Sequence, residues 1–147
     1  MITNAPAPET PQQRVSRLMK ANKSAGTKPE LALRRALWQA GARGYRLHPK
    51  AVPGRPDVAF PGAKLAVFVH GCYWHQCPRC AGKKAYPRAN QEFWRAKFAE
   101  NATRDERVKT LLEKMGWQSL VVWECEVKEN VGERAAQILA ELGKKRR

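Results

Sequence analysis

The stretch that decides the fold is LAVFVHGCYWHQCPRC, residues 65–80. Its first five residues form an apolar run typical of a strand that is buried on both faces. The rest of the stretch brings two imidazoles, three thiols and two adjacent aromatic rings into about one loop's length. Imidazoles serve acid–base chemistry, thiolates bind metals and aromatic rings stack on bases. In a strongly basic chain, this combination indicates an enzyme that cuts nucleic acid.

The chain has 147 residues, of which 28 are basic and 13 acidic, so its formal net charge is +15. The length fits one domain with a substantial core. A basic surface attracts polyanions, although charge alone is equally compatible with an unrelated basic protein. No apolar run approaches the roughly 20 residues that a bilayer span needs, and the first residues do not read as a signal peptide. We therefore expect no membrane partner and a cytoplasmic location, where thiols stay reduced.

The pattern of apolar residues predicts an α/β fold, with a central mixed β-sheet flanked by helices. Thr27 and Glu30 have the spacing of a capping box, which begins a helix that ends near Gly41. We expect strands at residues 45–48, 57–60, 65–69 and 117–123, and helices at residues 91–115 and 131–142. Three tryptophans are expected to pack in the core: Trp38, Trp117 and Trp123.

The ends of the chain differ in composition from its centre. Residues 1–13 are rich in Pro, Ala, Asn and Thr, which is typical of a disordered tail. Residues 14–143 are expected to form a single domain. Its first part, residues 14–28, is a basic arm that either orders on a phosphate backbone or remains a solvated linker. Residues 144–147 form a basic tail.

The four cysteines predict a structural zinc site. Cys72, Cys77 and Cys80 are close in sequence, and Cys125 follows the last predicted strand. A closed tetrahedron of thiolates is a common structural zinc site, and here it would clamp a loop that has few apolar residues. Two alternatives remain, namely small buried residues without metal and a redox pair formed by Cys77 and Cys80.

One carboxylate and two imidazoles are candidates for catalysis. Asp57 stands at the start of a central strand, where it could bind Mg²⁺ or merely cap the strand. If four thiols fill the zinc tetrahedron, His70 and His75 are free to transfer protons, although both could instead be structural. His48, beside a proline, is interpreted as a surface or loop residue.

Three aromatic residues could contact DNA. Tyr73 and Trp74 project from the predicted metal-bound loop, and Trp94 lies near the start of the long helix, next to Arg95. Such rings either stack on bases or unstack a base step, and the alternative is that they pack in the core.

Five segments, in the same order along the chain, resemble the very short patch repair endonucleases, a family that nicks DNA at thymine–guanine mismatches. They are TKPEL (27–31), PGRPD (53–57), VFVHGCYWH (67–75), EFW (92–94) and VWEC (122–125). The resemblance runs from about Arg17 to Cys125, which is most of the chain. It implies a restriction-endonuclease-like fold with a zinc-stabilised loop. It also implies a Mg²⁺-dependent nick 5′ to the mismatched thymine, in the repair of deaminated 5-methylcytosine.

The resemblance also implies roles for individual residues. Asp57 matches the metal-binding aspartate, and the backbone carbonyl of Val69 would join it. His70 and His75 match two active-site histidines, and Glu30 matches an acid that supports them. A wedge beside the mismatch would comprise Tyr73, Trp74 and Trp94, with Met19 inserted from the other groove. Near residues 76–80 this chain departs from the family, which can use a histidine as one zinc ligand.

The family resemblance further implies a monomer that acts on mismatched double-stranded DNA in the bacterial nucleoid. A functional link to a cytosine-5 DNA methyltransferase and to mismatch-repair factors is also implied. Two other functions remain open from the residues. One is a restriction-type nuclease that acts on matched DNA, and the other is a non-catalytic, zinc-bearing DNA-binding module.

Overall fold

Strand β3 (Leu65–His70) forms the centre of the fold. In the computed structural model, which describes residues 7–14, 26–80 and 90–145, β3 lies between β2 (Val58–Phe60) and β4 (Gln118–Trp123). Strand β1 (Arg46–Leu47) completes the order β1-β2-β3-β4 within these residues. The β1–β2 and β2–β3 pairs are antiparallel, and β3–β4 is parallel. The predicted mixed α/β architecture is therefore confirmed.

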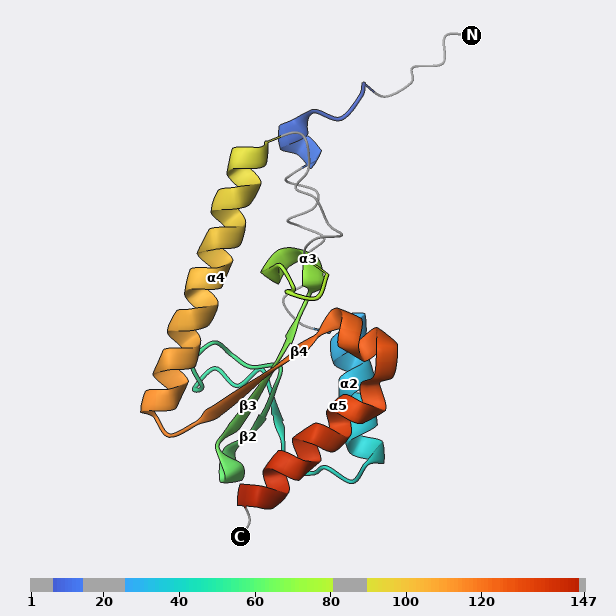
Figure 1. Cartoon of the computed structure of the whole chain (residues 1–147), viewed down its shortest axis with the longest axis vertical. Coiled ribbons are helices and arrows are strands. Elements are labelled where there is room, and N and C mark those ends of the chain that lie inside the picture. Colours follow the sequence, from blue (N-terminus) through green and yellow to red (C-terminus); the bar gives the residue numbers. More distant parts are fainter. Residues whose placement is uncertain (1–6, 15–25, 81–89, 146–147) are drawn as a thin grey trace.

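The side chains of β3 alternate between two hydrophobic clusters, because successive residues of a strand point to opposite faces. Leu65 and Val67 pack in a cluster with helices α2 (Lys28–Gln39) and α5 (Glu124–Lys145). Ala66 packs on the other face, with residues of α4 (Gln91–Lys114) and its flanks. Figure 1 shows the same layers, with α2 and α5 together on one side of the sheet and α4 on the other. By this alternation, His70 belongs to the α4 side.

Helix α2 begins as the capping box predicts, with one difference that matters for the site. The Thr27 hydroxyl accepts a hydrogen bond from the backbone N–H of Glu30 at 3.4 Å. The Glu30 carboxylate, however, accepts through Oε2 from the backbone N–H of Gly26 at 2.6 Å, rather than from Thr27. Leu33 and Leu37 bury the inner face of the helix. Glu30 is thereby held in the interior, with 1% of its surface exposed.

Helix α5 differs from the prediction because it begins directly after β4. Asn130 has non-helical torsions (φ −162°, ψ 87°), and its side chain accepts from the backbone N–H of Glu133 at 3.2 Å. The predicted helix 131–142 is thus the second part of α5, which Asn130 caps. Cys125 lies in the first helical turn instead of at a strand end. The helix also extends to Lys145, into the expected basic tail.

One other expectation needs correction. Trp38 is 55% exposed instead of packing in the core, and the guanidinium of Arg43 lies 3.4 Å from the centre of its ring. Near the end of the segment expected to be a tail, residues 11–14 form a helical turn, and Thr10 and Gln13 exchange hydrogen bonds between side chain and backbone. Most of the expected basic arm lies outside the described residues. Among the described helices, none has the length and apolar character needed to cross a bilayer.

Candidate active site and cysteine cluster

A cleft of about 1190 Å³ opens where the ends of β3 and β4 meet α4 and the start of α2. Its walls also include residues 54–57 before β2 and the short helix α3 (Cys72–His75). Five of the predicted site residues line it: Asp57, Val69, His70, Trp74 and His75. Four basic residues lie in the same walls: Lys28, Arg55, Arg104 and Lys109. The cleft therefore combines acidic, imidazole and basic groups on one concave surface.

Asp57 is fixed to the end of β3 by a hydrogen bond. Its Oδ2 atom accepts from the backbone N–H of Val69 at 2.6 Å. Burial raises the pKa of Asp57 above its ordinary value, and the charge of Glu30 adds to this, whereas the Val69 N–H opposes it. A buried carboxylate with a raised pKa gains from a nearby cation. The second carboxylate oxygen, Oδ1, faces away from this hydrogen bond toward His48, whose Nε2 is 3.3 Å distant.

The sequence predicts a surface or loop position for His48; it does lie in a loop, but between two carboxylates. Its Nε2 atom is 2.7 Å from Glu30 Oε1, in addition to the 3.3 Å contact with Asp57. The signal that could have found it is strand register. Leu47, the last residue of β1, pairs with Val58 of β2, so the next residue along the chain, His48, stands opposite Asp57. Glu30 does not line the cleft; it lies behind His48.

His70 and His75 stack on each other, with ring centroids 3.8 Å apart and an angle of 6° between the ring planes. The Nδ1 atom of His75 is 2.7 Å from the Oδ2 atom of Asp105 on α4. Burial, together with the neighbouring His75 ring, lowers the pKa of His70 to about 4. Burial alone would raise the pKa of Asp105, but the hydrogen bond and charge of His75 lower it below its ordinary value.

Sequence reasoning missed Asp105. It lies in the run RDER, residues 104–107, which is typical of a solvated helix face. Only the packing of α4 beside α3 reveals that this carboxylate reaches an imidazole 30 residues earlier in the chain. The side chain of Asn101, one helical turn before Asp105, also donates to the backbone carbonyl of Trp74 at 3.0 Å. Helix α4 therefore both orients His75 and holds α3 in place.

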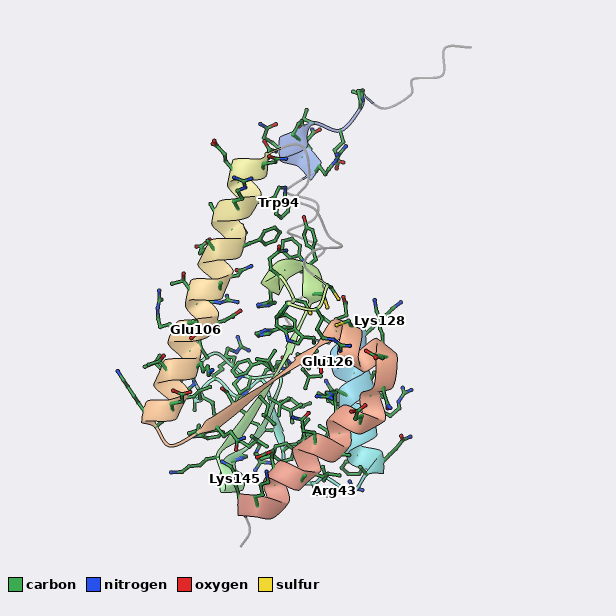
Figure 2. All side chains as sticks on the ribbon, in the orientation of Figure 1. Arg43, Trp94, Glu106, Glu126, Lys128 and Lys145 are labelled. Atoms are coloured by element: carbon green, nitrogen blue, oxygen red, sulfur yellow. The ribbon has the colours of Figure 1, made fainter. Side chains whose placement is uncertain are left out.

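The four cysteines converge, although they come from three separate pieces of structure. Cys72 is in the first turn of α3, Cys77 and Cys80 are in the turn that follows, and Cys125 begins α5. All four Sγ atoms lie within 4.8 Å of one another, and those of Cys77 and Cys125 are 3.8 Å apart. Sulfur sticks gather between α3 and the start of α5 in Figure 2. Tetrahedral Zn²⁺ with Zn–S bonds of about 2.3 Å needs sulfurs about 3.8 Å apart. This donor set fits such an ion.

The aromatic residues of the site form one cluster of four rings: Tyr73, Trp74, Trp94 and Phe98. Neighbouring ring centroids in this cluster are 5.2 to 5.8 Å apart. Trp94 is only 2% exposed, and Figure 2 shows it on the side of α4 that faces α3. Among the three residues expected to contact DNA, Tyr73 and Trp74 are half-buried, whereas Trp94 supports them from behind. Met19 lies outside the described residues.

Comparison with known proteins assigns this chain to a family. Residues 9–81 match the family described as DNA mismatch endonuclease Vsr. A type II nicking enzyme of Neisseria meningitidis serogroup C, V.NmeDIP, is 44% identical over 121 residues, which cover 82% of this chain and 80% of that protein. The chain belongs to the Vsr family of DNA mismatch endonucleases.

Two further relatives are named as a nicking enzyme and as a mismatch endonuclease. A type II nicking enzyme of Xanthomonas oryzae, V.XorIIP, is 40% identical over 112 residues, or 76% of this chain and 80% of that protein. DNA mismatch endonuclease Vsr of Escherichia coli is 38% identical over 81 residues, or 55% of this chain and 51% of that protein. As a Vsr-family protein related to nicking enzymes, the chain is a DNA endonuclease.

Proposed function

We propose that this Vsr-family chain nicks one strand of double-stranded DNA, 5′ to the thymine of a T:G mismatch. The proposed setting is very short patch repair of deaminated 5-methylcytosine, on a restriction-endonuclease-like fold. The observation that carries the proposal is that one cleft is lined both by the Asp57–Val69 pair and by the His75–Asp105 pair. A carboxylate for a cation and an oriented imidazole for a proton are what phosphodiester hydrolysis requires.

Asp57 and the backbone carbonyl of Val69 are the proposed Mg²⁺ ligands. In an antiparallel pair, the N–H and C=O of one residue point to the same neighbouring strand. The Val69 carbonyl therefore faces the edge from which its N–H reaches Asp57. Two hard oxygens on one side of a cleft suit Mg²⁺, which keeps several waters. When bound, the ion would stabilise negative charge on the phosphate and on its leaving oxygen.

His75 is the proposed acceptor of the proton from the attacking water. With Nδ1 held by Asp105, the other ring nitrogen of His75 is the one available for proton transfer. The Asp105 carboxylate then stabilises the imidazolium that forms. His70, with a pKa of about 4, is neutral at neutral pH and is proposed to lie nearer the scissile phosphate. Glu30 is proposed to support this arrangement from the interior.

The proposed basis of selectivity is that a mismatch opens more easily than a matched pair. A wedge that unstacks a base step costs less at a wobble pair, which stacks and pairs less well. Tyr73 and Trp74 are the proposed wedge, backed by Trp94, with Met19 entering from the other groove. A zinc ion on Cys72, Cys77, Cys80 and Cys125 is proposed to brace α3 beneath the wedge. Basic residues of the cleft would attract the phosphates.

The proposed biological setting is the one that the family resemblance implies. The chain is proposed to act as a monomer on nucleoid DNA in the cytoplasm, together with a cytosine-5 DNA methyltransferase and mismatch-repair factors. A restriction-type nuclease that acts on matched DNA is a second candidate. It is favoured by the names of the Xanthomonas and Neisseria relatives, which are type II nicking enzymes.

Labelled duplexes that carry T:G, T:A or C:G at one position, incubated with Mg²⁺, separate the candidates. The proposal predicts a single nick on the thymine strand of the T:G duplex, with none on the matched duplexes and none when EDTA replaces Mg²⁺. Cleavage of matched duplexes would support the restriction-type function. Binding without any cleavage would support a non-catalytic module and contradict both nuclease functions.

A further inference from the structure

At the wall of the cleft, three potential ligand atoms converge from different parts of the chain. They are Oε1 of Glu30 in α2, Nε2 of His48 after β1 and Oδ1 of Asp57 before β2. The histidine nitrogen is 2.7 Å from the glutamate oxygen and 3.3 Å from the aspartate oxygen. One ligand atom from each residue lies within 4.8 Å of the others, which is the spacing of atoms around a single cation. This cluster shares Asp57 with the pair formed by Asp57 and Val69 but uses the other carboxylate oxygen.

Two of these atoms are buried without a hydrogen-bond partner. Among the described residues, neither Glu30 Oε1 nor His48 Nε2 has one, although the two atoms are only 2.7 Å apart. Glu30 is almost fully buried, and its other oxygen is already occupied by the Gly26 N–H. Buried polar atoms in native proteins are normally satisfied. A cation bound by both atoms would satisfy them.

The local backbone fixes this convergence. His48 has a left-handed conformation (φ 47°), which is uncommon for a residue other than glycine. Strand register sets it opposite Asp57. The one charged side chain that the structure places near Glu30 Oε1 from the same helix, Arg34, is 3.6 Å away, beyond a short hydrogen bond. Arg34 offsets part of the negative charge of the two carboxylates but does not satisfy Oε1 or Nε2.

We propose that Glu30, His48 and Asp57 form a second metal site, which binds a divalent transition-metal ion such as Mn²⁺ more tightly than Mg²⁺. This deepens the proposed function and rests on it, because Asp57 would serve both sites, through Oδ1 here and through Oδ2 on the Val69 side. An imidazole nitrogen favours transition metals, whereas Mg²⁺ prefers oxygen ligands alone. A set of one nitrogen and two carboxylate oxygens therefore selects Mn²⁺ over Mg²⁺ at this position.

The test measures Mn²⁺ binding without DNA, in the full chain with its cysteine cluster loaded with zinc and other metals removed. Pulsed electron paramagnetic resonance of the bound Mn²⁺ should show coupling to a ¹⁴N nucleus, which reports an imidazole ligand. His48→Gln should abolish this coupling and weaken Mn²⁺ binding at least about 10-fold. The matched control is His75→Gln, which makes the same change in the other imidazole cluster and should keep both the coupling and the affinity.

Each outcome decides the proposal. Nitrogen coupling that persists in His48→Gln, or that is lost in His75→Gln instead, overturns it, as does wild-type protein that binds no Mn²⁺ or shows no coupling. If His48→Gln does not fold, nuclear magnetic resonance of the wild-type protein replaces it. Mn²⁺ should then broaden the ring signals of His48 more than those of His70 or His75, and the reverse order overturns the proposal. Mg²⁺-dependent nicking of T:G duplexes is measured separately. The proposed nuclease function and the proposed second metal site can therefore each fail without the other.

Discussion

The Nδ1 atom of His75 lies 2.7 Å from the Oδ2 atom of Asp105, across the boundary between α3 and α4. This contact joins α3, which lies beside the cysteine cluster, to α4, which covers the face of the sheet opposite α2 and α5. It leaves the second ring nitrogen of His75 available for proton transfer. In the proposed mechanism, proton transfer would therefore depend on how α4 packs against α3, as well as on the histidine itself.

The first prediction concerns this pair. His75→Ala should lower the single-turnover nicking rate on a T:G duplex by about 10²- to 10⁴-fold, which is the usual contribution of a positioned general acid or base to the rate. Asp105→Asn should lower it by on the order of 10²-fold, because an amide cannot stabilise the imidazolium. The double variant should be no slower than His75→Ala, since residues that act as a unit are not additive.

Duplex affinity is the control for this pair, and it should change little in all three variants. The exposed carboxylate of Glu113, on the same helix but outside the cleft, provides a matched substitution, Glu113→Gln, that should nick at the wild-type rate. Fully additive losses in the double variant would show that the two residues act separately.

The second prediction concerns the cysteine cluster. Cys125→Ser should prevent binding of the proposed zinc ion, because it removes the sulfur that α5 contributes to the cluster. Metal content is measured by atomic spectroscopy and stability by the midpoint of thermal unfolding, which should fall together with nicking activity. Chelation of the wild-type protein should reproduce the variant, since structural metal binding contributes directly to folding. A metal-stripped protein with full activity and an unchanged midpoint would contradict the bracing role.

The third prediction concerns the wedge. Trp74→Ala should reduce the preference for T:G over T:A duplexes, measured as a ratio of dissociation constants, by on the order of 10-fold, because stacking on a base contributes about 1–3 kcal/mol. Trp38→Ala removes an exposed tryptophan on α2, away from the cleft, and should leave the ratio unchanged. Equal effects of the two substitutions would assign Trp74 to general affinity or stability.

The fourth prediction concerns the loop that delivers Asp57. Gly54 has φ +78°, and a Cβ atom there would lie 2.4 Å from a methyl group of Val108 on α4. Gly54→Ala should therefore lower the free energy of unfolding in urea by about 1–3 kcal/mol from overpacking, in addition to the backbone cost. Gly44→Ala is the control, because it has the same backbone conformation (φ +79°) with open space around it. Equal losses for the two variants would show that packing against α4 contributes nothing.

The order of strands and long helices could be predicted from periodicity, because β3 is a continuous apolar run and α2 carries its own cap. The start of α5 could not, because residues 124–129 have little apolar patterning and their helix is fixed by tertiary contacts. Trp38 shows the opposite error: its large apolar side chain predicts a core position, but it lies at the surface, where it makes a cation–π contact with Arg43.

Within the site, motif residues close in sequence were found, whereas partners brought in by packing were missed. His70, His75 and three of the cysteines lie within one segment of 11 residues, 70–80, and their chemistry is visible there. Asp105 reaches the site because α4 packs beside α3, and His48 reaches it because of the register of β1 against β2. Neither relation is encoded in local spacing. Both residues are polar groups in segments that sequence patterns alone assign to a solvated surface.

The central claim is that this cleft is the nuclease centre, and Asp57→Asn tests it most directly. The variant keeps the shape of the side chain but removes its charge, and its folding is checked by zinc content and thermal unfolding. Single-turnover nicking of a T:G duplex with Mg²⁺ should fall by at least about 10²-fold, the scale of removing one key electrostatic group, while duplex binding is retained. Nicking at the wild-type rate by a folded Asp57→Asn protein would contradict the account.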